Sequence, residues 1–228
     1  TLFSDPNGRG WMISAVLFDA FGTIVRIRRR TNPYLQLMRE GRRQGLPITL
    51  EITKLAMTAD LPFAGSADHL GITLSASKRI ELSEALEEEL SSIEPYPDAV
   101  RAVAELQDAG ILVGVCSNLA QPYGAGVKEL FPNIGYHAFS FELGVTKPDP
   151  HIYRFICGQM GVDPGHCFDP EKGQVLMIGD SPRCDRDGPR AAGIMGHLLH
   201  RDARGPITDL TKFAQLVLDR NRAETPGN

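Results

Sequence analysis

The sequence predicts an α/β protein in which a parallel sheet has helices on both faces and a block of helices interrupts the chain after the first strand. Three short apolar runs, at Ile13–Phe18, Ile111–Cys116 and Gln174–Ile178, lack the alternation of half-buried strands and are typical of strands buried on both faces. From Val100 onward predicted strands alternate with predicted helices, as they do in a parallel sheet. The stretch 24–95 contains helical patterns only.

Composition and charge narrow the classes of function. The 228 residues carry a formal net charge of −4, with 42% hydrophobic and 23% charged residues, which is ordinary for a soluble globular protein. This length suffices for one large domain or for a domain with a smaller insert. The acidic balance gives no electrostatic basis for binding nucleic acid or an anionic membrane. No apolar run approaches the roughly 20 residues that span a bilayer.

The N-terminal residues and the cysteines predict a cytoplasmic protein. Residues 1–11 lack the basic, apolar and cleavage-site pattern of a signal peptide. The cysteines form no Cys-x-x-Cys pair and no zinc-ligand spacing, so reduced thiols are expected. The four are Cys116, Cys157, Cys167 and Cys184.

The first predicted strand runs directly into a carboxylate. Ile13–Phe18 is followed by Asp19, and Gly22 indicates a sharp turn or a close backbone approach just beyond it. Ligands of open α/β sheets bind at the carboxyl ends of the parallel strands. Asp19 is therefore a candidate functional residue, although aspartate is also common as a simple turn residue.

The helical block begins at Asn32-Pro33, which fits an N-cap followed by proline at the first helical position. Leu50–Met57 predicts a second short helix, and a longer helix begins near Ser75. The apolar stripe of this longer helix consists of Leu82, Leu86, Leu90 and Ile93. Its solvated faces are expected to carry Glu84, Glu87, Glu88 and Glu89. No strand pattern interrupts the block.

The rest of the chain supplies the remaining layers of the sheet protein. A helix with a stop signal at Gly110 precedes the second strand. The later elements expected are, in order, a helix around 126–130, a short strand near 137–141, a helix capped by Asp149 with Pro150 at its first position, a short helix before Gly193, a strand over 194–199 and a polar tail over 220–228.

Polar residues follow the predicted strands at the points where each strand ends or in the next loop. Taken singly, each has an ordinary interpretation as a turn, cap or surface residue. Because the carboxyl ends of parallel strands share one edge of the sheet, the set is expected to converge there, which favours a functional site. The set consists of Asp19, Ser117 and Asn118, Lys147, Gly179 and Asp180, and Asp185.

In this order, the residues resemble the four motifs of the haloacid dehalogenase superfamily of hydrolases. Asp19-Ala20-Phe21-Gly22-Thr23 is similar to the first motif, which holds a nucleophilic aspartate. Ser117 is similar to the second motif, and Lys147, in Lys-Pro-Asp-Pro, is similar to the third. Gly179-Asp180 together with Asp185 is similar to the acidic fourth motif.

The resemblance covers about residues 13–200 and implies both the architecture and the kind of activity. The core would be Rossmann-like and consist of residues 1–26 and 96–228. An all-helical cap would occupy residues 27–95. The protein is then expected to be a hydrolase, monomeric or homodimeric, that acts on a small molecule.

For a phosphorylated metabolite, the resemblance implies a Mg²⁺-dependent phosphatase. Asp19 can attack phosphorus to form an aspartyl-phosphate, with Lys147 bridging nucleophile and phosphate as a point charge. The Ser117 hydroxyl and the Asn118 backbone N–H are expected to hold phosphoryl oxygens, in a substrate site that Phe21 borders. Mg²⁺ prefers oxygen ligands. Its expected ligands are Asp19, Asp180, Asp185 and the backbone carbonyl of Phe21.

Phe21 departs from the pattern of the superfamily's phosphatases, in which the residue two after the nucleophile is typically a second aspartate that serves as general acid and base. Phenylalanine cannot transfer a proton, and such help is worth roughly 10²–10⁴-fold in rate. Three hypotheses stay open. The protein is a phosphatase that is slow or selective for good leaving groups, a 2-haloacid dehalogenase, whose halide needs no proton, or a non-catalytic member that binds phosphate or a partner.

The dehalogenase hypothesis also bears on the acidic pair and on an arginine of the cap. The first motif of 2-haloacid dehalogenases resembles the sequence Asp-Ala-Tyr-Gly-Thr. These enzymes need no metal, however, and they generally lack an acidic pair such as Asp180 and Asp185. Their cap also supplies an arginine for the halide and the carboxylate. The candidates for that arginine here are Arg39, Arg42 and Arg43. The acidic pair favours the phosphatase hypothesis.

Overall fold

The computed structural model, which describes residues 12–164 and 174–224, contains a five-stranded parallel sheet. The central strand β1 (Ile13–Phe18) pairs with β4 (Leu112–Ser117) on one side and with β6 (Gln174–Gly179) on the other. The outer strands are β5 (Tyr136–Phe139), beside β4, and β7 (Met195–Leu198), beside β6. The predicted α/β class with a parallel sheet is confirmed.

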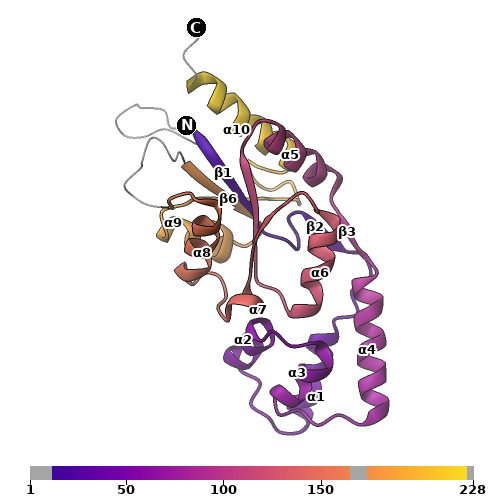
Figure 1. Ribbon diagram of the computed structural model, residues 1–228. Coiled ribbons are helices and arrows are strands. Elements are labelled where there is room, and N and C mark those ends of the chain that lie inside the picture. Colours follow the sequence, from indigo (N-terminus) through magenta and orange to yellow (C-terminus); the bar gives the residue numbers. More distant parts are fainter. Residues whose placement is uncertain (1–11, 165–173, 225–228) are drawn as a thin grey trace.

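Helices cover both faces of this sheet, which explains why its strands are continuously apolar (Figure 1). On one face, Val16 and Phe18 pack with α5 (Pro97–Asp108) and α10 (Leu210–Glu224). On the other face, Ala15 and Leu17 pack with α8 (Pro150–Met160). The next helix after β4, α6 (Gln121–Leu130), lies on the first face.

Four consecutive helices follow β1 in the chain, before α5, and lie at one end of the molecule, beyond α6 and α7 (Ser140–Leu143) (Figure 1). They are α1 (Pro33–Arg43), α2 (Leu50–Thr58), α3 (Phe63–His69) and α4 (Ala76–Leu90). The sequence pattern does not predict helix α3, because Pro62 and Gly65 interrupt the helical periodicity there. Its first residue Phe63 is buried against the ring of Tyr34, with ring centroids 4.9 Å apart.

The expectation that 24–95 holds no strand is wrong. Strands β2 (Val25–Ile27) and β3 (Ile93–Pro95) form an antiparallel ribbon that brackets the four helices. Arg26 lies opposite Glu94 in this ribbon, and an ion pair of 2.5 Å joins them. Strands of three residues are too short to show a period of two, so the sequence pattern could not reveal them.

The C-terminal region also differs from its prediction. Residues 220–224 belong to α10 rather than to a polar tail, and the Asn221 side chain exchanges hydrogen bonds of 2.7 and 2.8 Å with the backbone of Ile13. The short helix expected before Gly193 is a π-helical turn, η1 (Pro182–Asp187), followed by α9 (Gly188–Ala191). The signal-peptide prediction for residues 1–11, and the expectation for Cys167, lie outside the described residues.

The capping predictions for α5 and α8 are confirmed, whereas the Asn32 side chain makes no capping hydrogen bond at the start of α1. Gly110 follows α5 with φ of +78°, in the left-handed region that glycine adopts without strain. The Asp149 side chain accepts a 2.9 Å hydrogen bond from the backbone N–H of His151 and so caps α8.

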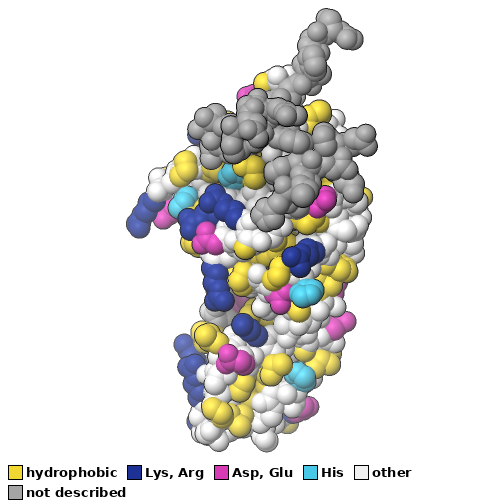
Figure 2. Space-filling view, turned by 90° about the vertical axis from the view of Figure 1, so that its left-hand side faces the viewer, with side chains coloured by type: hydrophobic (Ala, Val, Ile, Leu, Met, Phe, Trp, Pro, Cys, Tyr) yellow, Lys and Arg dark blue, Asp and Glu magenta, His cyan; other side chains and the backbone are white. Residues whose placement is uncertain are grey.

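Within the described residues, no helix combines the length and the apolar composition needed to cross a membrane. Charged side chains of both signs share the face drawn in Figure 2.

Candidate active site

The carboxyl edge of the sheet gathers the polar residues that the sequence singles out. Asp19 follows β1, Ser117 ends β4, and Asp180 and Asp185 follow β6. The carboxylates of Asp19, Asp180 and Asp185 all lie within 4.8 Å of one another. With Lys147 they form what we call the Asp–Lys cluster. The structure therefore brings together four residues that are up to 166 positions apart in the chain.

Lys147 connects two of these carboxylates. Its ammonium Nζ donates to Oδ1 of Asp19 at 2.7 Å and to Oδ1 of Asp185 at 2.6 Å. Both contacts are buried, since Lys147 is 4% exposed and Asp185 is fully buried. The second oxygen of Asp185 accepts the backbone N–H of Ser181 at 2.8 Å. The three side chains thus hold one another in a fixed geometry.

Burial shapes the electrostatics of the cluster. Loss of solvation raises the pKa of Asp185 to about 6, with the Asp19 charge adding to it and Lys147 opposing it. Burial, followed by the Asp19 charge, also raises the pKa of Asp180. For Lys147, burial alone would lower the pKa, but Asp19 and Asp185 outweigh it and hold the pKa above its usual range.

The donor set of the cluster fits a divalent cation. Three carboxylates face a single ammonium group, so the ionised cluster keeps a net negative charge that such a cation would offset. All three candidate ligands are hard oxygen donors, which suit Mg²⁺ better than softer metals. Asp180 is the exposed member and leaves the cluster open on its side.

Two glycines allow the backbone to approach these carboxylates closely. Gly22 has φ of +84°, and a Cβ there would collide with the Asp180 carboxylate. A Cβ on Gly179 would collide with the carboxylate of Asp185. The sequence reading of Gly22 as a turn with a close backbone approach is confirmed by this geometry.

Asn118 does more than its expected backbone role. Its side-chain Nδ2 donates to the carbonyl oxygen of Lys147 at 3.0 Å, and its Oδ1 accepts the Lys147 backbone N–H at 2.7 Å. This two-way clamp fixes the backbone that carries the ammonium group. Ser117, at the end of β4, is buried beside it.

Arg201 secures the turn that follows Asp19, and sequence reasoning missed it. Its guanidinium donates to the carbonyl oxygens of Gly22 at 3.2 Å and Thr23 at 2.5 Å. It also pairs with Asp98 at 3.1 Å and lies 3.6 Å above the ring of Tyr96. No local motif marks Arg201, because its partners are far away in the sequence.

Beside the cluster lies a pocket of about 240 Å³, which we call the apolar pocket. Phe21 lines it, with its ring edge-on to that of Tyr123 at 5.6 Å between centroids. Asn118 lines it next to Lys147. The described residues that line it are Phe21, Ile27, Tyr34, Met38, Thr53, Ala56, Met57, Glu89, Asn118, Leu119, Ala120 and Tyr123.

Glu89 lies in this pocket, so its assignment to a solvated face is wrong. It is 4% exposed, and its Oε1 accepts the Tyr123 hydroxyl at 3.0 Å. Its Oε2 accepts the Asn32 backbone N–H at 2.6 Å and the Thr31 hydroxyl at 3.1 Å. The sequence held a signal for this, because Glu89 follows Leu82 by seven and Leu86 by three positions and so shares their helix face.

The three cap arginines named as candidate halide ligands do not line the apolar pocket. Arg39, Arg42 and Arg43 are exposed. Arg39 and Arg43 line a separate surface hollow with Lys78, and Arg43 pairs with Glu40 at 2.6 Å. The structure therefore brings none of them to the side of the Asp–Lys cluster that the pocket occupies.

Comparison with known proteins links this site to a family. The model of haloacid dehalogenase-like hydrolases matches residues 13–193. The phosphoserine phosphatase of Thermus thermophilus is 29% identical over 130 residues, which cover 54% of this chain and 48% of that protein. The (S)-2-haloacid dehalogenase 4A of Burkholderia cepacia is 31% identical over 100 residues, 42% of this chain and 43% of that protein. The chain thus aligns with about half the length of these relatives.

A solved structure agrees over most of the chain. The HAD phosphatase from Thermococcus onnurineus superposes with a TM-score of 0.62 at 20% identity, covering 90% of this chain and 97% of that one, which shows a shared fold. The family match spans all four motif positions, from Asp19 to Asp185, and confirms the resemblance that those residues carry. The chain belongs to the haloacid dehalogenase-like hydrolases.

Proposed function

We propose that this protein is a Mg²⁺-dependent phosphatase that hydrolyses a small phosphorylated metabolite through an aspartyl-phosphate. The observation that carries the proposal is the Asp–Lys cluster, in which a buried ammonium holds the nucleophile candidate and three carboxylates leave a net negative charge for a divalent cation. Positioning and charge stabilisation supply most of the catalysis of phosphoryl transfer.

Asp19 acts as the nucleophile. Lys147 binds its Oδ1, so the other oxygen, Oδ2, attacks phosphorus while the bond from phosphorus to the ester oxygen breaks. Water then hydrolyses the aspartyl-phosphate, which returns the carboxylate and releases inorganic phosphate. Lys147 stays in contact with Asp19 and neutralises charge on the transferring group throughout.

The remaining residues bind and orient the substrate. The Ser117 hydroxyl and the Asn118 backbone N–H hold phosphoryl oxygens, and the Asn118 side chain keeps Lys147 in place. Asp19, Asp180, Asp185 and the Phe21 carbonyl would hold Mg²⁺, which offsets the negative charge of the phosphate when bound. Residues 27–95 act as a cap over residues 1–26 and 96–228, and exclude water from the site.

Phe21 cannot protonate the leaving group. The departing oxygen must then take its proton from water, which favours substrates whose leaving groups are stable as anions. This explains how the enzyme operates with phenylalanine at the position of the usual second aspartate.

The dehalogenase alternative rests on Phe21, since halide departs without a proton. A 2-haloacid carries a carboxylate, however, and the residues that line the apolar pocket include no Lys, Arg or His to bind it. A non-catalytic member would also keep the buried Lys147 contact with Asp19 as a structural ion pair, so phosphate release that is lost in Asp19→Asn separates an enzyme from it. The phosphatase accounts for both the cluster and the pocket.

The decisive experiment measures phosphate release from an aryl phosphate, with Mg²⁺ and with a chelator, for the wild type and for Asp19→Asn. Release that needs both Mg²⁺ and Asp19 supports the proposal. A rise in melting temperature with Mg²⁺ reports metal binding independently of turnover. Absence of phosphate release at high enzyme concentration, together with halide release from a 2-haloacid, would replace the proposal with the dehalogenase.

A further inference from the structure

The apolar pocket is placed to receive the part of the substrate that leaves. Phe21 borders it two residues after Asp19, and Asn118 borders it while clamping Lys147. The opposite wall comes from β2 and from helices α1, α2 and α4. A phosphoryl group held at the Asp–Lys cluster would therefore direct its ester substituent into this space.

The lining of the pocket is mostly apolar and contains no cation. Nine of its residues are aliphatic, aromatic or methionine, and the described lining has no Lys, Arg or His. At about 240 Å³, the space is smaller than the roughly 300–1,000 Å³ typical of pockets for drug-sized ligands. The pocket therefore suits a substituent of about one ring or a short aliphatic chain.

Among the described residues that line the pocket, Glu89 is the one with a formal charge. Three protein donors bind its carboxylate: the Tyr123 hydroxyl, the Thr31 hydroxyl and the Asn32 backbone N–H. Burial and the neighbouring Glu89 raise the pKa of the Tyr123 hydroxyl, and the Arg30 charge opposes them. Arg30 itself is exposed and does not line the pocket, so it offers no partner for an anion bound inside.

We infer that the apolar pocket selects phosphate monoesters with a small, uncharged and largely apolar leaving group, and that Glu89 rejects leaving groups that carry a carboxylate. The inference rests on the proposed phosphatase activity and names its substrate class. A carboxylate in the pocket would lose its hydration without a cation to pair with and would face the like charge of Glu89. An aryl leaving group also departs as a stabilised anion, which agrees with Phe21 at the acid position.

The test compares two aryl esters that differ by one para carboxylate, phenyl phosphate and 4-carboxyphenyl phosphate, as substrates of the 228-residue chain with Mg²⁺. We expect the wild type to prefer phenyl phosphate in kcat/KM by at least about tenfold, because like charges brought together without solvent cost more than 1.4 kcal/mol. The Glu89→Gln variant is expected to reduce this preference several-fold, chiefly through the carboxylated ester.

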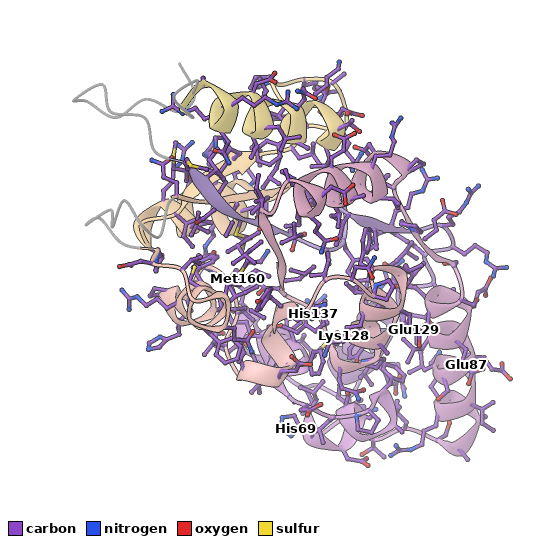
Figure 3. The ribbon with its side chains drawn as sticks, turned by 45° about the horizontal axis from the view of Figure 1, so that its top comes forward. His69, Glu87, Lys128, Glu129, His137 and Met160 are labelled. Atoms are coloured by element: carbon purple, nitrogen blue, oxygen red, sulfur yellow. The ribbon has the colours of Figure 1, made fainter. Side chains whose placement is uncertain are left out.

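The chain offers a matched control on the same helix. Glu87 is exposed, and in Figure 3 its side chain points from α4 away from the rest of the molecule. Glu87→Gln removes the same charge and is expected to keep the wild-type preference. Glu89→Gln is sterically mild, because its amide oxygen can accept from Asn32 and Thr31 while its amide nitrogen donates to the Tyr123 oxygen.

The outcomes separately test the phosphatase activity, the selectivity of the pocket and the role of Glu89. If neither ester is hydrolysed, the proposed phosphatase activity fails and the inference falls with it. If the wild type hydrolyses both esters equally well, the activity stands and the selectivity is overturned. If Glu89→Gln and Glu87→Gln shift the preference equally, Glu89 has no role in it. Should Glu89→Gln fail to fold, the wild-type preference, and competitive inhibition by phenol but not by 4-hydroxybenzoate, test the pocket directly.

Discussion

The Asp–Lys cluster and the apolar pocket lie side by side, yet they are built on opposite principles. In the cluster, Lys147 binds two buried carboxylates, and charge dominates every contact. In the pocket, apolar side chains surround a single carboxylate, Glu89, whose oxygens are already occupied by donors from the protein. In our proposal, the first region carries the chemistry of the reaction, and the second determines which substrate reacts.

Both phosphatases and dehalogenases occur among the relatives, so membership of the family alone does not fix the activity of this chain. In this chain, the features that bear on the choice between the two activities are the acidic residues Asp180 and Asp185 and the charge of the pocket lining. Predictions that disturb one region and spare the other test whether the division holds.

The largest effect is expected from Lys147→Met. Loss of the ammonium leaves Asp19 and Asp185 buried without their cation, which should cost about 3–5 kcal/mol of unfolding free energy. Phosphate release should fall on the order of 10³-fold, because the charge at the transferring group is lost. Urea denaturation and phosphate release measure the two effects.

Lys128→Met is the matched control for that variant. Lys128 lies on α6 (Figure 3) and forms a half-exposed ion pair with Glu142 at 2.8 Å. Its loss should cost less than about 1 kcal/mol and leave activity unchanged. Equal destabilisation by the two variants would show that the buried pairs contribute no more than a surface pair.

The second prediction concerns the leaving group. Because Phe21 cannot donate a proton, kcat/KM of the wild type should fall steeply as the pKa of the leaving alcohol rises. Between uncharged aryl esters and short alkyl esters the expected loss is on the order of 10²-fold or more, the scale of general acid catalysis. Rates across such a series of phosphate esters provide the measurement, and a flat dependence would indicate that another group supplies the proton.

The third prediction restores the missing acid. Phe21→Asp should raise turnover of alkyl phosphates by about 10–100-fold, below the full value of general acid catalysis because the new carboxyl stands in an apolar pocket. Phe21→Asn has nearly the same shape but transfers no proton, and it should bring no such gain. A folded Phe21→Asp variant without improvement, or an equal gain in Phe21→Asn, contradicts this role of position 21.

The core could be predicted from the sequence because burial on both faces leaves a direct trace. The runs that became β1, β4 and β6 are continuously apolar, and each ends in the polar residues that converge at the site. Helix α10 left an equally clear trace in the spacing of Leu210, Phe213 and Val217, which the sequence analysis missed. The short ribbon of β2 and β3 left none, since its strands contain three residues each.

The apolar pocket could not be predicted in the same way. Its lining comes from the loop after β1, from β2, from α1, α2 and α4, from the loop after β4 and from α6, and no local pattern relates these segments. The assignment of Glu89 to a solvated face is wrong because it rests on the charge of the residue and not on its position along the apolar stripe of α4. Short motifs in a sequence can indicate the type of reaction, whereas a specificity pocket forms only when segments distant in the sequence pack together.

The smallest predicted effect tests the pocket through Tyr123. Tyr123→Phe removes the hydroxyl that donates to Glu89 at 3.0 Å and should cost about 1.5–3 kcal/mol of unfolding free energy, the range for a hydrogen bond to a charged group. With Glu89→Gln as background the same change should cost less, and a double-mutant cycle measures the difference.

The same variant should also change the substrate preference. With one donor lost, Glu89 repels anions more strongly. The preference for phenyl over 4-carboxyphenyl phosphate should therefore rise a few-fold, opposite in sign to the change in Glu89→Gln. A fall in both variants would mean that the pocket responds to packing rather than to charge.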